Sequence, residues 1–251
     1  MEKKVFIIIG TITLIAIIVT SIIIFQNNNL KKENLKVGVG GEFPPFSYYD
    51  ENNKLTGLDI ELIKEIAKRM EMNVEFIAIP WVEIFDEVKD KNVDIIIDAI
   101  TITPERSQEM LFSDSYFLTG QSLVIKENNI EINSAKDLEN KKVGTQVGST
   151  GMERVMGYAK NIQFITYDNA FDSIEPLKRG TIDAIVVDFE VANKWVKNDN
   201  KLKISGDLLS EEYYGIAMDR NNMELMEKIN NILREMKNDG TLDKLKEKWI
   251  N

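Results

Sequence analysis

The sequence predicts an α/β protein with two lobes, preceded by a membrane-spanning helix. From residue 36 onward, short apolar strand patterns alternate with amphipathic helix patterns, as in sheets of parallel strands covered by helices. The alternation runs twice through the 251 residues without a long linker, which suggests two lobes sharing a cleft. Residues 5–25 contain no charged side chain, which predicts a helix long enough to cross a bilayer.

The amino-terminal segment, residues 1–30, is expected to be a membrane anchor or signal sequence followed by the start of a polar tether. Lys3 and Lys4 precede the apolar run, so its amino end should stay in the cytoplasm. A cleaved signal peptide would have a shorter apolar region and a small-x-small cleavage site. An uncleaved anchor is therefore favoured, with cleavage left open. In both cases the domain lies on the outer face of the cytoplasmic membrane, extracellular or periplasmic.

The first run of elements begins with a short strand at residues 36–40 and a Pro-rich loop that cannot be helical. Apolar residues then recur at helical spacing over residues 58–70. The remaining elements of this run are expected at residues 74–79 (strand), 82–89 (helix), 93–98 (strand) and 123–126 (strand).

The second run repeats the alternation. Its strands are expected at residues 142–146, 162–167, 182–188 and 215–218. Its helices are expected at residues 135–139, 149–158, 170–178, 189–196, 223–237 and 241–249. Asn238-Asp239-Gly240 separates the last two helices and is suited to a C-cap.

Composition excludes several classes of function. The chain has no Cys and no His, which rules out a Cys nucleophile, a Ser-His-Asp triad, a His-based metal site and a disulfide. A formal net charge of −10 is unsuited to nucleic acid, which needs a basic face. The sequence also lacks an EF-hand loop and a glycine-rich phosphate loop. No cofactor, metal ion, catalytic residue or nucleic-acid partner is expected.

The turn at residues 101–106 is a candidate anion site. Thr103 is suited to cap the next helix, and Pro104 is suited to its first position. Arg106 then lies with free backbone N–H groups at the carboxyl end of a strand, where α/β sheets bind ligands. From spacing alone, a surface Arg106 paired with Glu105 or Glu109 remains the alternative.

Nine landmarks spread over more than 200 residues carry a family resemblance. They are Phe43-Pro44-Pro45-Phe46, Leu55-Thr56-Gly57-Leu58-Asp59, Pro80-Trp81, Asp94 to Arg106, Phe112-Ser113-Asp114, Val143 to Gly151, Ile182-Asp183-Ala184, Tyr214-Gly215-Ile216-Ala217, and Asp239-Gly240 before Lys248-Trp249. In this order they resemble family 3 of the bacterial extracellular solute-binding proteins, the amino-acid receptors of ABC importers.

The resemblance implies a periplasmic-binding-protein-like fold of type II, in which two crossing hinge strands join the lobes. These strands would fall near residues 123–126 and 214–217. Lobe 1 would then comprise residues 34–123 with 217–251, and lobe 2 residues 126–214.

The resemblance also implies the roles of the cleft residues. Arg106 would hold the ligand carboxylate and Asp188 its ammonium, while Phe43 and Trp81 would sandwich its side chain. The remaining lining residues would be Thr101, which offers its hydroxyl, Asp98 and Ala99 beside it, and Gln146, Ser149 and Thr150, which resemble a second carboxylate clamp. Without the family context, Asp188 and Ser149 could be helix caps, and the aromatic rings could be core residues.

Two departures from the family pattern concern specificity. Gly40 stands where several relatives keep a carboxylate that reads the ligand side chain, and Asp98 stands where relatives often have a small or hydroxyl residue. Arg106, Asp98 and Asp188 together leave the cleft with one excess negative charge. A cationic side chain would neutralise it, which favours arginine, lysine or ornithine. Broad specificity, with Asp98 paired to a protein group, is the alternative.

The predicted function is that of a monomeric receptor which binds a free amino acid between its lobes. The closed form would dock on a membrane permease, and a separate ATPase would drive import. The first alternative is an enzyme on the same fold that dehydrates prephenate-like acids, with Asp98 or Glu42 as the general acid. The second is a sensor module acting through the anchor helix.

Overall fold

The computed structural model describes residues 32–250 of the chain. Within this range no helix is long and apolar enough to cross a membrane. The predicted membrane-spanning segment, residues 5–25, lies outside the described residues and stays a prediction.

The first sheet has the strand order β5-β1-β6-β15-β7. Its strands are β1 (Asn34–Val39), β5 (Asn73–Ala78), β6 (Ile95–Ile96), β7 (Leu111–Phe112) and β15 (Ala217–Met218). β1 pairs parallel with both β5 and β6, whereas β15 pairs antiparallel with β6 and β7. The sheet is therefore mixed rather than purely parallel, because β15 belongs to the last part of the chain and enters from the opposite direction.

The helices of this lobe confirm the sequence periodicity. They are α2 (Leu58–Arg69), α3 (Trp81–Lys89), α4 (Pro104–Glu109), α8 (Met223–Asn238) and α9 (Thr241–Ile250). The apolar face of α2, which includes Leu58, Ile63 and Ile66, is fully buried. α2 packs against β5, α8 and α9, so the carboxyl-terminal helices complete the core around the first sheet.

The second sheet has the order β11-β10-β12-β9-β13. Its strands are β9 (Gln121–Lys126), β10 (Lys142–Gln146), β11 (Gln163–Tyr167), β12 (Ala184–Asp188) and β13 (Leu202–Ser205). β10 pairs parallel with β11 and β12, and β9 pairs antiparallel with β12 and β13. This lobe also contains the helical segments η1 (Ala135–Leu138), α5 (Gly151–Met156), η2 (Ala170–Ser173), α6 (Ile174–Arg179) and α7 (Phe189–Asn198).

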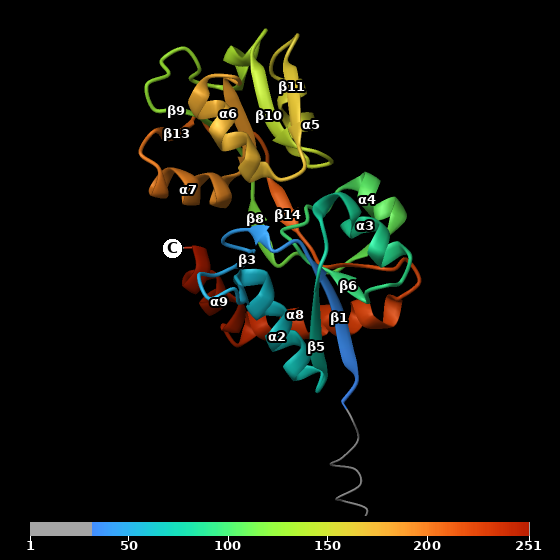
Figure 1. The fold of residues 1–251 in the computed structure, drawn as a ribbon. Helices are drawn as coiled ribbons and strands as arrows, with labels where there is room; N and C mark the ends of the chain where they lie inside the picture. The colour runs from blue at the N-terminus through green and yellow to red at the C-terminus, as the bar shows by residue number, and fades with distance from the viewer. Residues whose placement is uncertain (1–31, 251) are drawn as a thin grey trace, which may run out of the picture. The chain divides into compact units, whose positions relative to one another are not determined.

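Two strands link the sheets. β8 (Phe117–Thr119) and β14 (Glu212–Tyr214) pair antiparallel and run side by side between the two sheets (Figure 1). The prediction that residues 123–126 form a crossing strand is wrong, because these residues belong to β9 and pair with β12 and β13. The crossing occurs earlier, at β8, and the second crossing strand is β14.

A small antiparallel sheet was not expected from the sequence. It consists of β2 (Glu42–Phe43), β3 (Ser47–Tyr49) and β4 (Leu55–Thr56). The Pro-rich loop is therefore the connection of a hairpin, which places Phe43 on a paired strand. The predicted strand at residues 93–98 is shorter than expected, because only Ile95 and Ile96 pair with β1 as strand residues. The lobe boundaries given above remain a prediction.

Candidate functional site

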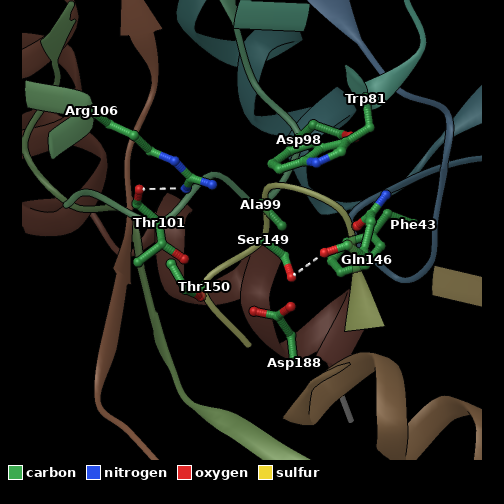
Figure 2. Close-up of a pocket in the computed structure, with 10 residues that line it drawn as sticks. All are labelled: Phe43, Trp81, Asp98, Ala99, Thr101, Arg106, Gln146, Ser149, Thr150 and Asp188. Carbon is green, nitrogen blue, oxygen red and sulfur yellow. Dashed lines mark hydrogen bonds between the residues drawn. The ribbon is translucent and has the colours of Figure 1, made fainter. Parts of the chain in front are cut away.

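One cavity brings together all ten residues singled out in the sequence, as Figure 2 shows. About 320 Å³ of space, part of it open to solvent, lies between these side chains. The chain before β8 contributes Phe43, Trp81, Asp98, Ala99, Thr101 and Arg106, and the chain between β8 and β14 contributes Gln146, Ser149, Thr150 and Asp188.

Arg106 is held in place by the turn that precedes it. The hydroxyl of Thr103 accepts a hydrogen bond from the Arg106 backbone N–H at 3.2 Å, as expected of an N-cap. The guanidinium donates from Nη1 to the Thr101 carbonyl at 2.8 Å and from Nη2 to the Gly148 carbonyl at 3.0 Å. It also lies 4.9 Å from the ring centre of Phe85. Two of its five N–H groups are thus used, and the others remain to hold an anion.

The alternative of a surface Arg106 paired with neighbouring acids does not occur. Glu109 lies 3.3 Å from Lys89 instead. Burial lowers the pKa of Arg106, and the negative charges of Glu212 and Asp188 partly oppose this effect. The guanidinium remains charged at any physiological pH because its ordinary pKa is so high.

Asp188 ends β12 and is 8% exposed. It stands at the N-cap position of α7, but its side chain makes no capping hydrogen bond. Its Oδ1 accepts a hydrogen bond from the hydroxyl of Tyr214 at 2.5 Å. Burial raises the pKa of Asp188 to about 7, and repulsion by Glu212 adds to this effect, while the hydrogen bonds from Tyr214 and Gln121 oppose it. Such a carboxylate gains from a cation placed beside it.

Ser149 does not cap α5 either. Its hydroxyl donates to the Gln146 carbonyl at 2.8 Å, and α5 begins only at Gly151. The alternative in which Ser149 is an N-cap is therefore wrong, because its oxygen bonds backward along the loop.

Phe43 and Trp81 form the aromatic part of the lining. Phe43 is half-buried and stacks on Phe46 at 6.3 Å between ring centres. The Trp81 indole N–H donates to the Val147 carbonyl at 2.8 Å. Trp81 therefore contacts the opposite side of the cavity, while its ring also packs on Phe85 against the hydrophobic core of its own side.

Three hydrogen bonds cross the cleft directly. They are Trp81 to Val147, Arg106 to Gly148, and Asn169 Nδ2 to Glu42 Oε2 at 2.6 Å. Each joins a residue before β8 to one after it, so the two sides of the cavity are held together by the protein itself.

Asp98 takes the space that a side chain at position 40 would need. A Cβ added to Gly40 would lie 2.3 Å from Asp98 Oδ2, well inside van der Waals contact. Asp98 is 6% exposed, and its Oδ1 accepts from the Ser47 hydroxyl at 2.6 Å. Burial raises the pKa of Asp98 to about 6, while the hydrogen bond from Ser47 opposes the shift.

Ala99 has a left-handed backbone, with a φ of 51° that non-glycine residues seldom adopt. Its N–H donates to Asp59 Oδ2 at 2.8 Å, and Asp59 Oδ1 accepts from the Tyr116 hydroxyl at 2.8 Å. Asp59 is fully buried in α2. It therefore fixes the turn that carries Asp98 and Thr101 toward the cavity.

A second hollow continues from the cavity past the aromatic rings. It comprises about 560 Å³ of space, part of it open to solvent, and shares Phe43, Trp81, Asp98 and Gln146 with the first. Its other walls include Glu42 and Asp168. Among the residues that the structure describes, no Lys or Arg lines this hollow. Within the same range no cluster of acidic side chains is arranged to hold a metal ion.

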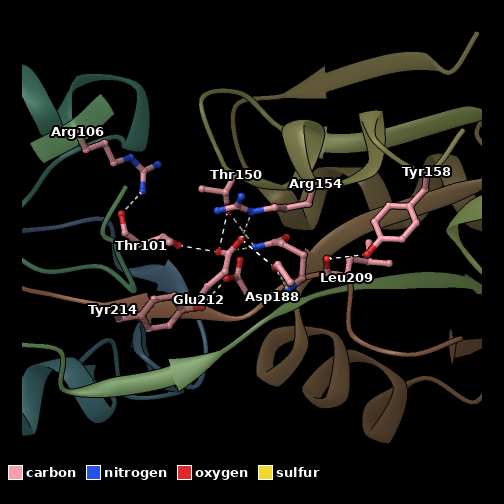
Figure 3. A network of polar contacts seen from close by, with 11 residues as sticks. Thr101, Arg106, Thr150, Arg154, Tyr158, Asp188, Leu209, Glu212 and Tyr214 are labelled. Carbon is pink, nitrogen blue, oxygen red and sulfur yellow. Dashed lines mark hydrogen bonds and ion pairs between the residues drawn. The ribbon is translucent and has the colours of Figure 1, made fainter. Parts of the chain in front are cut away.

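Sequence reasoning missed two residues that organise the site, Glu212 and Tyr214 of β14. Figure 3 shows both beside the cavity residues, joined to Thr101, Thr150 and Asp188. In the sequence, Glu212 is a glutamate followed by two tyrosines, and nothing among its neighbours marks its side chain as buried.

Comparison with known proteins identifies the family. Residues 35–251 match the family model of the bacterial extracellular solute-binding proteins, family 3. The chain is a family 3 solute-binding protein. Its two-lobed α/β architecture is that of periplasmic binding proteins, and the relatives described next are named as binding proteins.

Three relatives illustrate the range of this family 3 protein's similarities. The L-cystine-binding protein TcyJ of Escherichia coli K12 is 34% identical, and the match covers 89% of this chain and 85% of TcyJ. The arginine-binding extracellular protein ArtP of Bacillus subtilis 168 is 32% identical, with 87% of each chain covered. The structure of an ancestral arginine-binding protein bound to arginine is 43% identical with a TM-score of 0.84, covering 88% of this chain and 100% of that one.

Proposed function

We propose that this protein is the receptor of an amino-acid ABC importer and that its ligand has a cationic side chain, such as arginine, lysine or ornithine. The named relatives bind arginine or cystine, so family membership supports an amino acid but leaves its side chain open. The decision between these ligands depends on the far end of the cleft.

The backbone of the amino acid would be held by opposite charges. Arg106 binds the carboxylate with its unused N–H groups, and Asp188 binds the ammonium. Each ligand charge would be costly to bury alone, and each finds a partner here. The ligand side chain then extends between Phe43 and Trp81, whose faces favour a flat cation.

The single observation that carries the specificity is the acidic lining beyond the rings. Asp98, Glu42 and Asp168 contribute three carboxylates, and no basic residue among the described ones opposes them. A guanidinium or ammonium gains from these charges, whereas the side-chain carboxylate of glutamate would be repelled. The raised pKa of Asp98, caused first by burial, reflects an unfavourable charge that a cation would stabilise.

The test compares L-arginine with L-citrulline, its neutral near-isostere, by calorimetry on the domain from residue 34. We expect arginine to bind at least about tenfold tighter, which corresponds to about 1.4 kcal/mol for one added charge contact. Glutamine and cystine should bind more weakly than arginine. Equal affinity for arginine and citrulline, or tighter binding of cystine, would contradict the cationic assignment.

Position 40 offers a matched variant pair. Asp98→Asn should reduce the preference for arginine over citrulline, because it removes one of the three carboxylates. Gly40→Asp combined with Asp98→Ser should restore it, because the new carboxylate can use the vacated space, and Gly40 has no left-handed φ that would oppose a side chain. Gly40→Asp alone should weaken binding of every ligand because of the clash with Asp98.

Transport follows from closure of the cleft. A ligand that contacts both lobes stabilises the closed form, which we propose docks on a membrane permease driven by a separate ATPase. An amino-terminal anchor would keep the receptor on the outer face of the cytoplasmic membrane. Uptake of labelled arginine by cells that lack or carry the gene is the direct test of this role.

A further inference from the structure

Glu212 lies at the centre of the hinge and contacts both sides of the cleft. It is the first residue of β14 and is 1% exposed. Its Oε2 accepts the hydroxyls of Thr101 and Thr150, each at 2.8 Å, and its Oε1 accepts from Arg154 Nε at 2.9 Å (Figure 3). One buried carboxylate thus joins the turn before Arg106 to the loop before α5.

Glu212 is ionised in this setting. Burial alone would raise its pKa, but the hydrogen bonds from Arg154, Thr101 and Thr150 outweigh burial and hold the pKa below its usual value. An ionised carboxylate has no proton and can only accept. Both hydroxyl contacts must therefore be donated by the threonines.

The direction of these hydrogen bonds determines whether the threonine hydroxyls can donate or only accept on the side of the cavity. A hydroxyl has one hydrogen, so Thr101 and Thr150 have none left once they donate to Glu212. Only oxygen lone pairs remain on the side that lines the cavity. Gln121 Nε2, at 3.3 Å from Thr150 Oγ1, occupies one of the lone pairs of Thr150 and leaves another.

We infer that Glu212 is a positioning residue that makes the hydroxyls of Thr101 and Thr150 hydrogen-bond acceptors toward the ligand. Together with Asp188 they form an end of the cavity lined by three acceptors, which matches the three N–H donors of an ammonium group. The hydroxyl of Thr150 then faces the ligand ammonium and not its carboxylate, in contrast to the clamp expected from the sequence. This inference rests on the proposed function, since it assumes an amino-acid ligand.

The charges around Asp188 also favour an ammonium at this end of the cavity. The negative charge of Glu212 raises the pKa of Asp188, after burial as the main cause, and it also attracts the Arg106 guanidinium. An arriving ammonium relieves the repulsion between Glu212 and Asp188. Glu212 thus acts on the ligand without contacting it.

The test uses Glu212→Gln, which keeps the shape of the side chain. Arg154 donates at the Oε1 position, so the amide oxygen belongs there and the NH₂ group takes the Oε2 position, against both threonines. Both threonines must then accept from the amide and donate into the cavity. The control is Asp183→Asn, because Asp183 is a partly buried carboxylate that accepts from the Lys142 backbone N–H and lines no part of the cavity. Thermal unfolding of both variants verifies that they are folded.

The readout is a pair of ligands, L-arginine and 5-guanidinopentanoate, which is arginine without its amino group. We expect Glu212→Gln to weaken arginine binding by at least about tenfold, the size expected for losing a hydrogen bond to a charged group. Binding of 5-guanidinopentanoate, which has no ammonium, should change by less than about threefold. Asp183→Asn should leave both affinities within about twofold, because changes away from the site are small. An equal loss for both ligands in Glu212→Gln indicates a merely structural role and overturns the inference.

A second measurement needs no ligand. Neutron diffraction from the wild-type protein should place the deuterons of Thr101 and Thr150 on the lines to Glu212. A deuteron directed into the cavity overturns the inference even if Glu212→Gln fails to fold. If the wild-type protein binds no amino acid, the proposed function fails, while the deuteron positions still decide the role of Glu212.

Discussion

Lowering the pH from 8 to 5 should weaken arginine binding by about three orders of magnitude. Asp188 has a pKa of about 7 in the ligand-free protein, and a bound ammonium favours its ionised form. The group must therefore lose its proton on binding whenever the pH is below 7. Binding is strongest above pH 7 and falls about tenfold for each unit below it, so pH 5 costs about 100-fold, or about 2.7 kcal/mol.

Asp98 adds to this loss only for a cationic side chain. Its pKa is about 6, so holding its carboxylate ionised at pH 5 costs about a further tenfold. Arginine should thus lose about 1,000-fold between pH 8 and pH 5, and citrulline about 100-fold. The difference in slope separates the contribution of Asp98 from that of Asp188.

Calorimetry in buffers of different ionisation enthalpy measures both the affinity and the protons released. At pH 6 arginine binding should release more than one proton, because Asp188 is about 90% protonated there and Asp98 about half. Asp98→Asn should reduce the arginine profile to that of citrulline. Asp183→Asn should change neither, because Asp183 accepts from the Lys142 backbone away from the cavity. An affinity that is flat or rises as the pH falls from 8 to 5 would refute the assignment of Asp188 to the ammonium.

Three further outcomes are expected. Without ligand, the melting temperature should rise as the pH falls from 8 to 5, opposite to the affinity trend. Burial raises the pKa of Asp59, Asp98 and Asp188 to about 7, 6 and 7. The folded state therefore binds more protons than the unfolded state between pH 4 and 7, and protonation stabilises it. A melting temperature that falls as the pH is lowered over this range would exclude these pKa shifts. Arg106→Lys keeps the charge but loses the planar fork, and calorimetry should show at least about 30-fold weaker arginine binding; unchanged affinity would remove Arg106 from the site. Trp81→Phe keeps the aromatic wall but removes the hydrogen bond across the cleft, so affinity should fall about 2–10-fold while citrulline discrimination persists, and a loss of discrimination would assign the indole a direct ligand contact.

Local signals in the sequence were enough for much of the fold and for the candidate lining. The periodicity of residues 58–70 predicted α2 to within one residue, and the Thr103-Pro104 pair predicted the start of α4. These features are encoded by neighbours within a few positions. The ten chosen residues also converge on one cavity, although their roles toward a ligand stay a prediction.

The misses involve contacts between distant parts of the chain. β8 has three residues, too few for a periodic pattern, so no strand was expected there, and the crossing near residues 123–126 rested on the family resemblance alone. Glu212 meets Thr101 and Thr150 from positions 111 and 62 residues away, and no local pattern reports such a contact. The bond from Trp81 to Val147 is equally non-local.

The 2.3 Å approach between a side chain at position 40 and Asp98 has an evolutionary consequence. For a lineage that moves its selectivity carboxylate from position 98 to position 40, only one order of the two substitutions is open. Shortening residue 98 first leaves a viable, less discriminating intermediate, whereas enlarging residue 40 first produces a steric conflict. Ancestors within such a lineage should therefore have bound several amino acids, and present-day sequences should seldom have large side chains at both positions 40 and 98.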